Sequence, residues 1–196
     1  MKYHNFCVFF ILTFLSGLLY PENGNTNSNN TLQSQKSNNH IILLRHSIAP
    51  GFGDPENFEL SDCQTQRNLS RNGINQAQII GLFLKKNGYK KVIIYSSEWC
   101  RCKDTAKALN LGPYKTMHLL NSFFSNFAVE KEQTLALKKW IKNLPLSWPI
   151  ILVTHQVNIT ALTGYVPAQG ELVFVKRLEN GKVTIIDSIR VEDSNL

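Results

Sequence analysis

Three short runs of aliphatic residues divide the chain, and each leads directly into polar side chains of the kinds that carry chemistry. The runs are residues 41–44 (IILL), 92–95 (VIIY) and 150–153 (IILV). None of them alternates apolar with polar residues, so each is expected to form a strand that is covered on both faces. This pattern is typical of a parallel sheet that lies between two layers of helices.

Apolar residues at helical spacing separate these runs. Ser70 is expected to cap a helix that ends near residue 86, before an Asn-Gly pair. Further helices are expected after residue 99, before Pro145 and after His155, where apolar side chains recur every three to four positions. Alternation of strands and helices predicts an α/β fold, a three-layer sandwich whose mainly parallel sheet has helices on both faces.

The last part of the chain has a different pattern. Two strand-like runs, residues 171–178 and 183–191, flank the pair Asn180-Gly181. Asn-Gly between two such runs is a strong signal for a tight hairpin. We therefore expect a C-terminal antiparallel hairpin that joins the sheet near its edge.

The first 20 residues have the composition of a secretory signal. Residues 6–19 are almost all apolar, follow a single early lysine, Lys2, and are too few to span a bilayer comfortably. We predict a signal peptide over residues 1–20 and an exported chain, periplasmic or secreted, with no stable membrane span in its mature form. No pair of small residues marks a cleavage site, so an uncleaved anchor is one alternative, and a buried N-terminal strand or helix is another.

Residues 21–39 differ sharply in composition from the rest of the chain. They contain 7 Asn in 19 residues and one aliphatic side chain, Leu32. Such a segment cannot build a core, so we interpret it as a disordered linker. The remaining residues, 40–196, are enough for one domain with its own core.

Three cysteines lie beyond the signal: Cys63, Cys100 and Cys102. In an oxidising compartment, Cys63 is expected to form a disulfide with either Cys100 or Cys102, which leaves one free thiol. Three buried thiols are the alternative. A zinc site is disfavoured because a C-x-C pair lacks a second pair of ligands at the usual spacing.

The chain is basic, with 21 Lys and Arg against 14 Asp and Glu and a formal net charge of +7. The lysines are scattered near the ends of the expected elements, without interleaved aromatics or a nucleic-acid motif, so we expect no nucleic-acid partner. A field of this sign attracts anionic substrates.

Four candidate functional residues follow the expected strands. Arg45 and His46 end the first strand, Arg101 lies one helical turn beyond the second, and His155 ends the third. The carboxyl ends of the strands in an open α/β sheet form the ligand crevice, so these side chains should meet there. The two guanidinium groups repel metal ions but bind a phosphoryl group, so we expect no metal and no cofactor.

Chemically, a neutral imidazole can attack phosphorus and form a phosphohistidine. Nearby arginine charges disfavour protonation of a histidine, whose ordinary pKa is about 6.5. We therefore expect the arginines both to bind phosphate and to keep the imidazole in its nucleophilic form.

Four segments resemble, in family order, the motifs of the histidine phosphatase superfamily, whose fold is phosphoglycerate-mutase-like. They are LLRHSIAP (43–50), LSRNGINQA (69–77), SSEWCRCKDTA (96–106) and VTHQVNI (153–159). The resemblance implies that His46 accepts the phosphoryl group and that Arg45 and Arg101 hold it. It implies that His155 contacts the phosphate and stabilises the transition state.

The chain departs from the family pattern in three places. Ser47 and Gln156 replace the glycines that follow the two histidines, so each adds a hydrogen-bonding group and is a candidate substrate-binding residue. The acidic residue of the family's Leu-Asn-Glu-like stretch is missing, because residues 120–124 read LNSFF. Without a general acid, substrates whose leaving groups depart easily are favoured, such as acyl phosphates, phosphoramidates and anomeric sugar phosphates.

Another carboxylate could replace the missing acid. Glu171 is the first candidate, because an antiparallel strand that begins there would start on the catalytic face. Asp54, Glu130 and Glu132 follow, and for each of the four the alternative is a solvated surface charge.

The segment after His46 is a long loop punctuated by Gly and Pro, which is expected to face the substrate. Arg67 in this loop is a candidate contact for a second anionic group, or else a surface residue. Phe123, Phe124 and Phe127 are expected to anchor the core rather than form a pocket wall.

These features predict a metal-independent phosphatase that acts on a phosphorylated small molecule through a phosphohistidine on His46. One alternative is a non-catalytic module that binds phosphate or another anion without turnover. A phosphomutase is the other, although a single domain of this size has little room for the covering insertions that such enzymes use. The sequence leaves the physiological substrate and the oligomeric state open.

Overall fold

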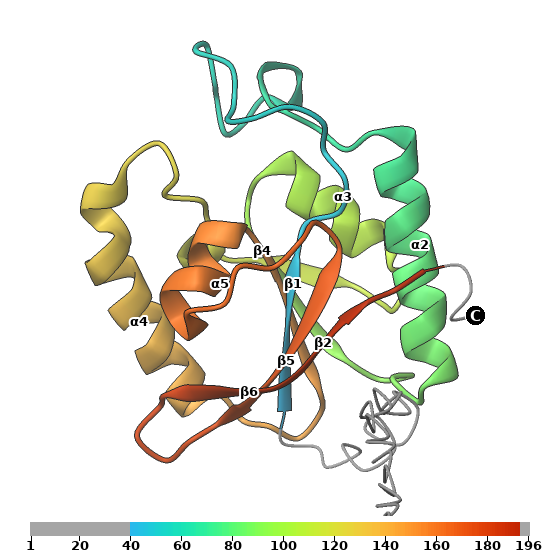
Figure 1. The fold of residues 1–196 in the computed structure, drawn as a ribbon, viewed down its shortest axis with the longest axis vertical. Helices are drawn as coiled ribbons and strands as arrows, with labels where there is room; N and C mark the ends of the chain where they lie inside the picture. Colours follow the sequence, from blue (N-terminus) through green and yellow to red (C-terminus); the bar gives the residue numbers. More distant parts are fainter. Residues whose placement is uncertain (1–39, 193–196) are drawn as a thin grey trace, which may run out of the picture.

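The computed structural model describes residues 40–192 and places one six-stranded sheet at the centre of the chain (Figure 1). The predicted signal peptide (1–20) and linker (21–39) lie outside the described residues. The strands are β1 (His40–Arg45), β2 (Ile93–Ser96), β3 (Tyr114–Thr116), β4 (Ile150–Thr154), β5 (Glu171–Arg177) and β6 (Val183–Arg190). The α-helices are α2 (Arg71–Lys86), α3 (Cys100–Ala108), α4 (Glu130–Asn143) and α5 (Gln156–Thr163).

The strand order is β3-β2-β4-β1-β5-β6, and the four strands from β3 to β1 run parallel. β5 pairs antiparallel with β1, and β6 pairs antiparallel with β5. This confirms the predicted α/β fold with a mainly parallel sheet and a C-terminal antiparallel hairpin. Only β6 of the hairpin lies at the edge, because β5 inserts between β1 and β6.

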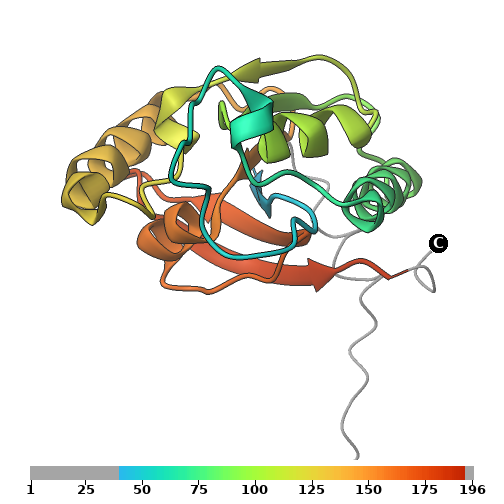
Figure 2. The same ribbon diagram turned by 90° about the horizontal axis from the view of Figure 1, so that it is seen from above.

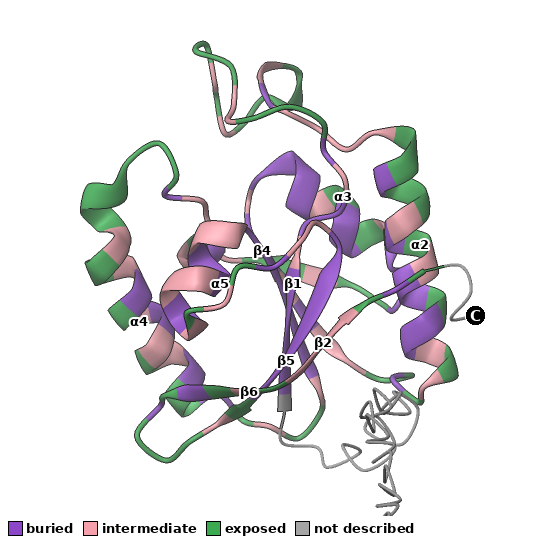
Figure 3. Cartoon of the chain, viewed as in Figure 1, coloured by how far each residue is buried: buried purple, intermediate pink, exposed green. Residues whose placement is uncertain are grey.

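The helices cover both faces of the sheet, as predicted, and Figure 2 shows the layers from above. Successive side chains of a strand point to opposite faces. Accordingly Ile42 and Leu44 of β1 pack in the core beneath α2 and α3, whereas Ile41 and Leu43 pack in the core beneath α4 and α5. β1, β4 and the first five residues of β5 are the most deeply buried strands (Figure 3). The run at residues 92–95 was expected to be covered on both faces as well, but β2 buries only Ile94 and Ser96 and leaves Ile93 and Tyr95 partly exposed.

Local signals set the helix ends. The Ser70 side chain accepts a hydrogen bond from the amide of Gly73 and so caps α2, as expected. Gly73 itself has no room for a side chain, since a Cβ there would lie 2.1 Å from the carbonyl oxygen of Ile48. This close approach joins the start of α2 to the loop that follows His46.

The sequence analysis missed β3, which lies at the edge of the sheet opposite β6. Its three residues, YKT, show neither a buried run nor alternation. β3 forms because β2 offers it a free edge, where it pairs in parallel register. Between residues 40 and 192 no helix is both long and apolar enough to cross a membrane.

Candidate active site

The carboxyl ends of β1 and β4 bring the predicted functional residues to one cavity. Arg45 ends β1 and aligns with Thr154 of β4, and the amide of His46 donates to the carbonyl of Thr154 at 2.9 Å. His155 precedes α5 and Arg101 lies in the first turn of α3. The side chains of Arg45, His46, Arg101 and His155 all line the cavity.

His46 is held with one ring nitrogen free. Its Nδ1 lies 2.9 Å from the carbonyl oxygen of Ser47, and because a carbonyl can only accept, Nδ1 carries the proton. Nε2 therefore keeps its lone pair. Burial, and then the positive charge of Arg101, lower the pKa of His46 to about 3, with a smaller contribution from Arg45. At neutral pH the ring is therefore uncharged.

The two arginines present unused hydrogen-bond donors. Arg45 donates from Nη1 to the carbonyl of Pro167 at 2.9 Å, and Arg101 donates from Nη1 and Nη2 to Asp54. The Nε atom of each arginine is buried without a hydrogen-bond partner within residues 40–192. Buried unsatisfied donors are rare, and here they supply two charged N–H groups for an anion beside His46.

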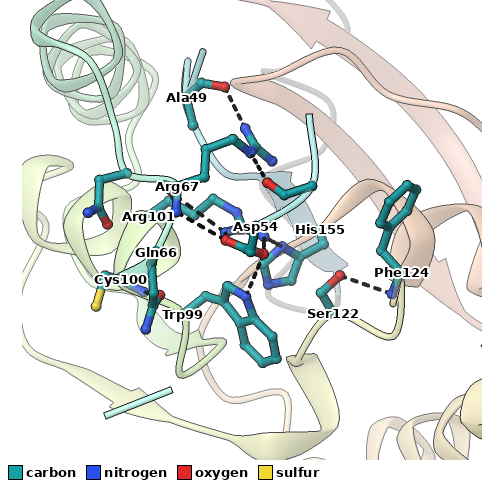
Figure 4. Close-up of polar contacts among 12 residues, drawn as sticks. Ala49, Asp54, Gln66, Arg67, Trp99, Cys100, Arg101, Ser122, Phe124 and His155 are labelled. Carbon is teal, nitrogen blue, oxygen red and sulfur yellow. Dashed lines mark hydrogen bonds and ion pairs between the residues drawn. The ribbon is translucent and has the colours of Figure 1, made fainter. Parts of the chain in front are cut away.

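Asp54 reaches into the cavity from the loop after His46 (Figure 4). Its carboxylate accepts from Arg101 at 2.7 and 3.2 Å, from the indole of Trp99 at 3.1 Å and from the amide of Arg67 at 3.1 Å. Burial raises the pKa of Asp54, but these hydrogen bonds and the charge of Arg101 outweigh burial and hold the pKa below its usual value. Among the four candidate acids, Asp54 alone lines the cavity, and it is ionised there.

His155 belongs to a chain of hydrogen bonds. Its Nε2 lies 2.9 Å from Ser97 Oγ, which donates to Asn121 Oδ1 at 3.1 Å, and Asn121 in turn donates to Glu98. Its Nδ1 lies 3.4 Å from Nη2 of Arg101, a group that can only donate. His155 is therefore neutral, with the proton on Nε2, and burial followed by the charge of Arg101 lowers its pKa well below the usual value. Its ring centroid lies 5.5 Å from that of His46.

Glu171 lies at the start of β5, as expected, but outside the cavity lining. It is 2 % exposed and accepts from the hydroxyl of Tyr165, the amide of Ala168 and Nε of Arg190. Burial raises the pKa of Glu171, yet these donors outweigh burial and lower it. Its contacts order the turn before β5, where Pro167 accepts the hydrogen bond from Arg45.

The other predicted residues take different positions. Gln156 and Arg67 line the cavity, and Arg67 uses Nε and Nη1 to hold the carbonyls of Gly53 and Ala49. Ser47 is fully buried and does not line the cavity, and its amide donates a hydrogen bond to Thr105 Oγ1. The remaining acid candidates, Glu130 and Glu132, lie in the first turn of α4 and do not line the cavity.

The disulfide joins Cys63 to Cys100, which decides between the two predicted pairings, and Cys102 is a buried free thiol. The bond ties the loop after His46 to the start of α3. Gln66 reinforces the tie, since its side chain accepts from the amide of Cys100 at 2.9 Å. Arg101 and its partner Asp54 are thereby held in one covalently linked unit.

The phenylalanine cluster differs from the expectation. Phe123 is buried and anchors the segment, but Phe124 and Phe127 are exposed, and Phe124 lines the cavity. Phe52, which the sequence analysis did not single out, also lines the cavity and contacts Phe124. The available signal was a phenylalanine between two glycines in the loop that follows Arg45 and His46.

Acidification should destabilise the fold. In the unfolded chain each histidine takes up a proton near pH 6.5, whereas folded His46 stays neutral to about pH 3 and burial also lowers the pKa of folded His155 well below its usual value. The unfolded state binds more protons in this window, so lowering the pH from 7 to 5 lowers the free energy of unfolding by about 2 kcal/mol through His46, and His155 lowers it further. Below about pH 4, loss of the ionised forms of Asp54 and Glu171 adds to the effect.

Urea unfolding at pH 7 and pH 5 measures this dependence. His46→Asn should reduce the pH slope relative to that of the wild-type chain. A slope in His46→Asn equal to that of the wild-type chain would contradict the prediction.

Comparison with known proteins shows the fold. No protein-family model and no curated protein sequence matches the chain. Among solved structures it is similar to the protein histidine phosphatase SixA bound to tungstate, at 14 % identity and a TM-score of 0.56, covering 77 % of this chain and 96 % of that one. A phosphoserine phosphatase from Entamoeba histolytica in complex with phosphoserine matches at 15 % identity and a TM-score of 0.56, over 80 % and 98 %.

A phosphoglycerate mutase from Plasmodium falciparum matches at 18 % identity and a TM-score of 0.50, over 78 % of this chain and 91 % of that one. The chain thus has the fold of the histidine phosphatase superfamily, a fold found in phosphatases and in a mutase. Within its described part, no three His, Cys, Asp or Glu side chains cluster as metal ligands would.

Proposed function

From the fold that this chain shares with the histidine phosphatase superfamily, we propose that it is a metal-independent phosphatase acting through a phosphohistidine on His46. One observation carries the proposal. His46 presents an unprotonated Nε2 on a neutral ring, in a cavity where Arg45 and Arg101 each keep a buried donor free. A nucleophile next to two guanidinium groups is what phosphoryl transfer requires.

In the proposed reaction, Nε2 of His46 attacks phosphorus in line, and the bond from phosphorus to the leaving oxygen breaks with its electron pair on that oxygen. Water then attacks phosphorus, the N–P bond breaks, and its electron pair returns to Nε2. Arg45 and Arg101 stabilise the phosphoryl oxygens throughout. His155 lies beside them and orients Arg101 through its Nδ1.

The leaving group receives no proton from a carboxylate in this scheme. Asp54 is ionised and paired with Arg101, and Glu171 lies outside the cavity. We therefore propose substrates whose leaving group departs readily without taking a proton from a carboxylate. In the family that the chain resembles, the acid comes from a Leu-Asn-Glu-like stretch. Here that stretch supplies Asn121, whose side-chain oxygen accepts hydrogen bonds from Ser97 Oγ and from the amide of Glu98, and an amide cannot act as a general acid.

Hydrolysis of p-nitrophenyl phosphate in the presence of EDTA tests the proposal. We expect turnover, release of inorganic phosphate and, in samples quenched with base, an enzyme-bound phosphate that is stable to base and labile to acid. A module that only binds anions would bind inorganic phosphate in calorimetry without releasing p-nitrophenol. A mutase would move phosphate between hydroxyl groups of one substrate faster than to water, and either result would replace the phosphatase proposal.

We also propose that the chain is exported. The disulfide between exposed Cys63 and buried Cys100 supports this, since such bonds persist in oxidising compartments. Mass spectrometry of the chain recovered from outside the cytoplasm should find a new N-terminus between about residue 16 and residue 24. An intact N-terminus in the cytoplasmic fraction would contradict export.

A further inference from the structure

The side chain of Phe52 is exposed to solvent and does not pack in the core. It lies between Gly51 and Gly53, whose φ angles of 92° and 66° are in the region that favours glycine, and it is 87 % exposed. The Gly-Phe-Gly turn projects the ring at the mouth of the cavity that contains His46. Exposed aromatic rings at the rim of a polar site are typical of ligand contacts.

A second ring faces it from another part of the chain. Phe124 is 40 % exposed, and its ring centroid lies 5.0 Å from that of Phe52 in an edge-to-face arrangement. Its backbone is fixed: the Phe124 amide donates to Ser122 Oγ at 3.2 Å, and the neighbouring Phe123 is buried (Figure 4). The ring on the glycine turn and the ring of Phe124 form one aromatic rim.

The rim and the cavity floor differ in chemistry. The floor offers the Nε donors of Arg45 and Arg101 beside Nε2 of His46, and so suits a phosphoryl group. Phe52 and Phe124 line the same cavity, so a group attached to that phosphoryl lies within reach of the two rings. Aromatic rings prefer edge-to-face and offset contacts with other rings, so the rim favours a planar aromatic group.

The ease with which the leaving group departs also favours an aryl group. A phenol ionises near pH 10, as tyrosine does, and is expelled as phenolate more easily than an aliphatic alcohol is expelled as alkoxide. Hydrolysis of an aryl ester therefore needs no proton from the ionised Asp54. We infer that the substrates are aryl phosphate monoesters, with Phe52 and Phe124 as specificity-determining residues that contact the aryl ring.

This inference rests on the proposed phosphatase function and specifies its substrate. In the first step the bond from His46 Nε2 to phosphorus forms and the bond from phosphorus to the aryl oxygen breaks, leaving a phenolate that takes its proton from water. Hydrolysis of the phosphohistidine then returns Nε2 with its lone pair and releases inorganic phosphate.

Calorimetric titration with phosphonates tests recognition apart from turnover. Phenylphosphonate should bind the wild-type chain more tightly than methylphosphonate does. The double variant Phe52→Ala with Phe124→Ala should weaken phenylphosphonate binding roughly four- to a hundredfold, from two- to tenfold per ring, and leave inorganic phosphate binding unchanged. Trp148→Ala, an exposed aromatic in the segment before β4, is the matched control and should change neither.

Equal binding of phenylphosphonate by wild type and double variant would overturn the inference, as would a parallel loss of phosphate binding. If the chain hydrolyses phosphate esters but the two rings do not favour aryl over alkyl groups, the phosphatase proposal stands and the aryl specificity is refuted. Discrimination between the phosphonates without any turnover would refute the phosphatase proposal and leave aryl recognition as a binding function.

Two sources of aryl phosphate remain to be separated, a small molecule and a phosphotyrosyl side chain of a protein. Comparing kcat/KM for phenyl phosphate, free phosphotyrosine and a phosphotyrosyl peptide distinguishes them. A peptide preferred tenfold or more over phenyl phosphate identifies a protein substrate, and the reverse preference identifies a small molecule. Ethyl phosphate turned over as fast as phenyl phosphate would reject both.

Discussion

His46→Ala is expected to lower kcat for p-nitrophenyl phosphate by on the order of 10³-fold or more and to abolish the enzyme-bound phosphate. The reason is geometric as well as chemical. His46 is 2 % exposed, its Nδ1 proton is held by the carbonyl of Ser47, and its free Nε2 faces the cavity that Arg45 and Arg101 line. Without the imidazole no phosphohistidine can form, so the two-step reaction is lost.

His118→Ala is the matched control, because that histidine is exposed beyond the cavity and its loss should leave kcat within about twofold. Urea unfolding of both variants separates a loss of chemistry from a loss of fold. Turnover by His46→Ala within tenfold of the wild type, or a phosphoenzyme that survives the substitution, would show that another group is the nucleophile.

Arg101→Lys is expected to lower kcat/KM by roughly 10²- to 10³-fold even though the positive charge is kept. Arg101 is 3 % exposed and uses both terminal nitrogens on Asp54 while its Nε stays free, and its Nη2 also approaches His155. A lysine ammonium cannot make a bidentate pair with Asp54 and at the same time offer a donor to phosphate in the same plane.

The retained charge makes this variant informative. Because an ammonium at the same place still disfavours protonation of His46, a loss of rate would reflect the geometry of the guanidinium rather than a change in the pKa of the nucleophile. Arg71→Lys, at the exposed start of α2, is the matched control and should keep kcat/KM unchanged. An Arg101→Lys chain with near-normal kcat/KM would mean that Arg101 acts on the loop through Asp54 and not on the phosphate.

Much of the architecture could be predicted because it is encoded locally. Unbroken aliphatic runs such as residues 41–44 must be covered on both faces, and they form the central strands β1 and β4. Parallel strands end at one edge, so residues that follow them meet there, as Arg45, His46 and His155 do. The hairpin at Asn180-Gly181 was predicted from its turn, where Gly181 has a φ of 82°.

The remaining features depend on contacts between distant segments. Asp54 and Arg101 are 47 residues apart, and no local pattern pairs them. Glu171 begins the strand that was expected, yet Tyr165 and Arg190 turn its carboxylate away from the cavity. Local periodicity likewise could not separate the buried ring of Phe123 from the exposed ring of Phe124, because the segment between β3 and α4 has no regular period.

By itself, then, the order of residues determined the sheet, its helices and the edge where the histidines and arginines meet, because strand and helix periods are properties of neighbouring positions. Only the tertiary structure decided which cysteine Cys63 would pair with, which carboxylate would enter the cavity and which rings would surround it. Those outcomes depend on the path of the loop after His46. Local pattern does not determine that path, because the contacts of the loop with Arg101, Trp99 and Cys100, which lie far along the chain, help to set it.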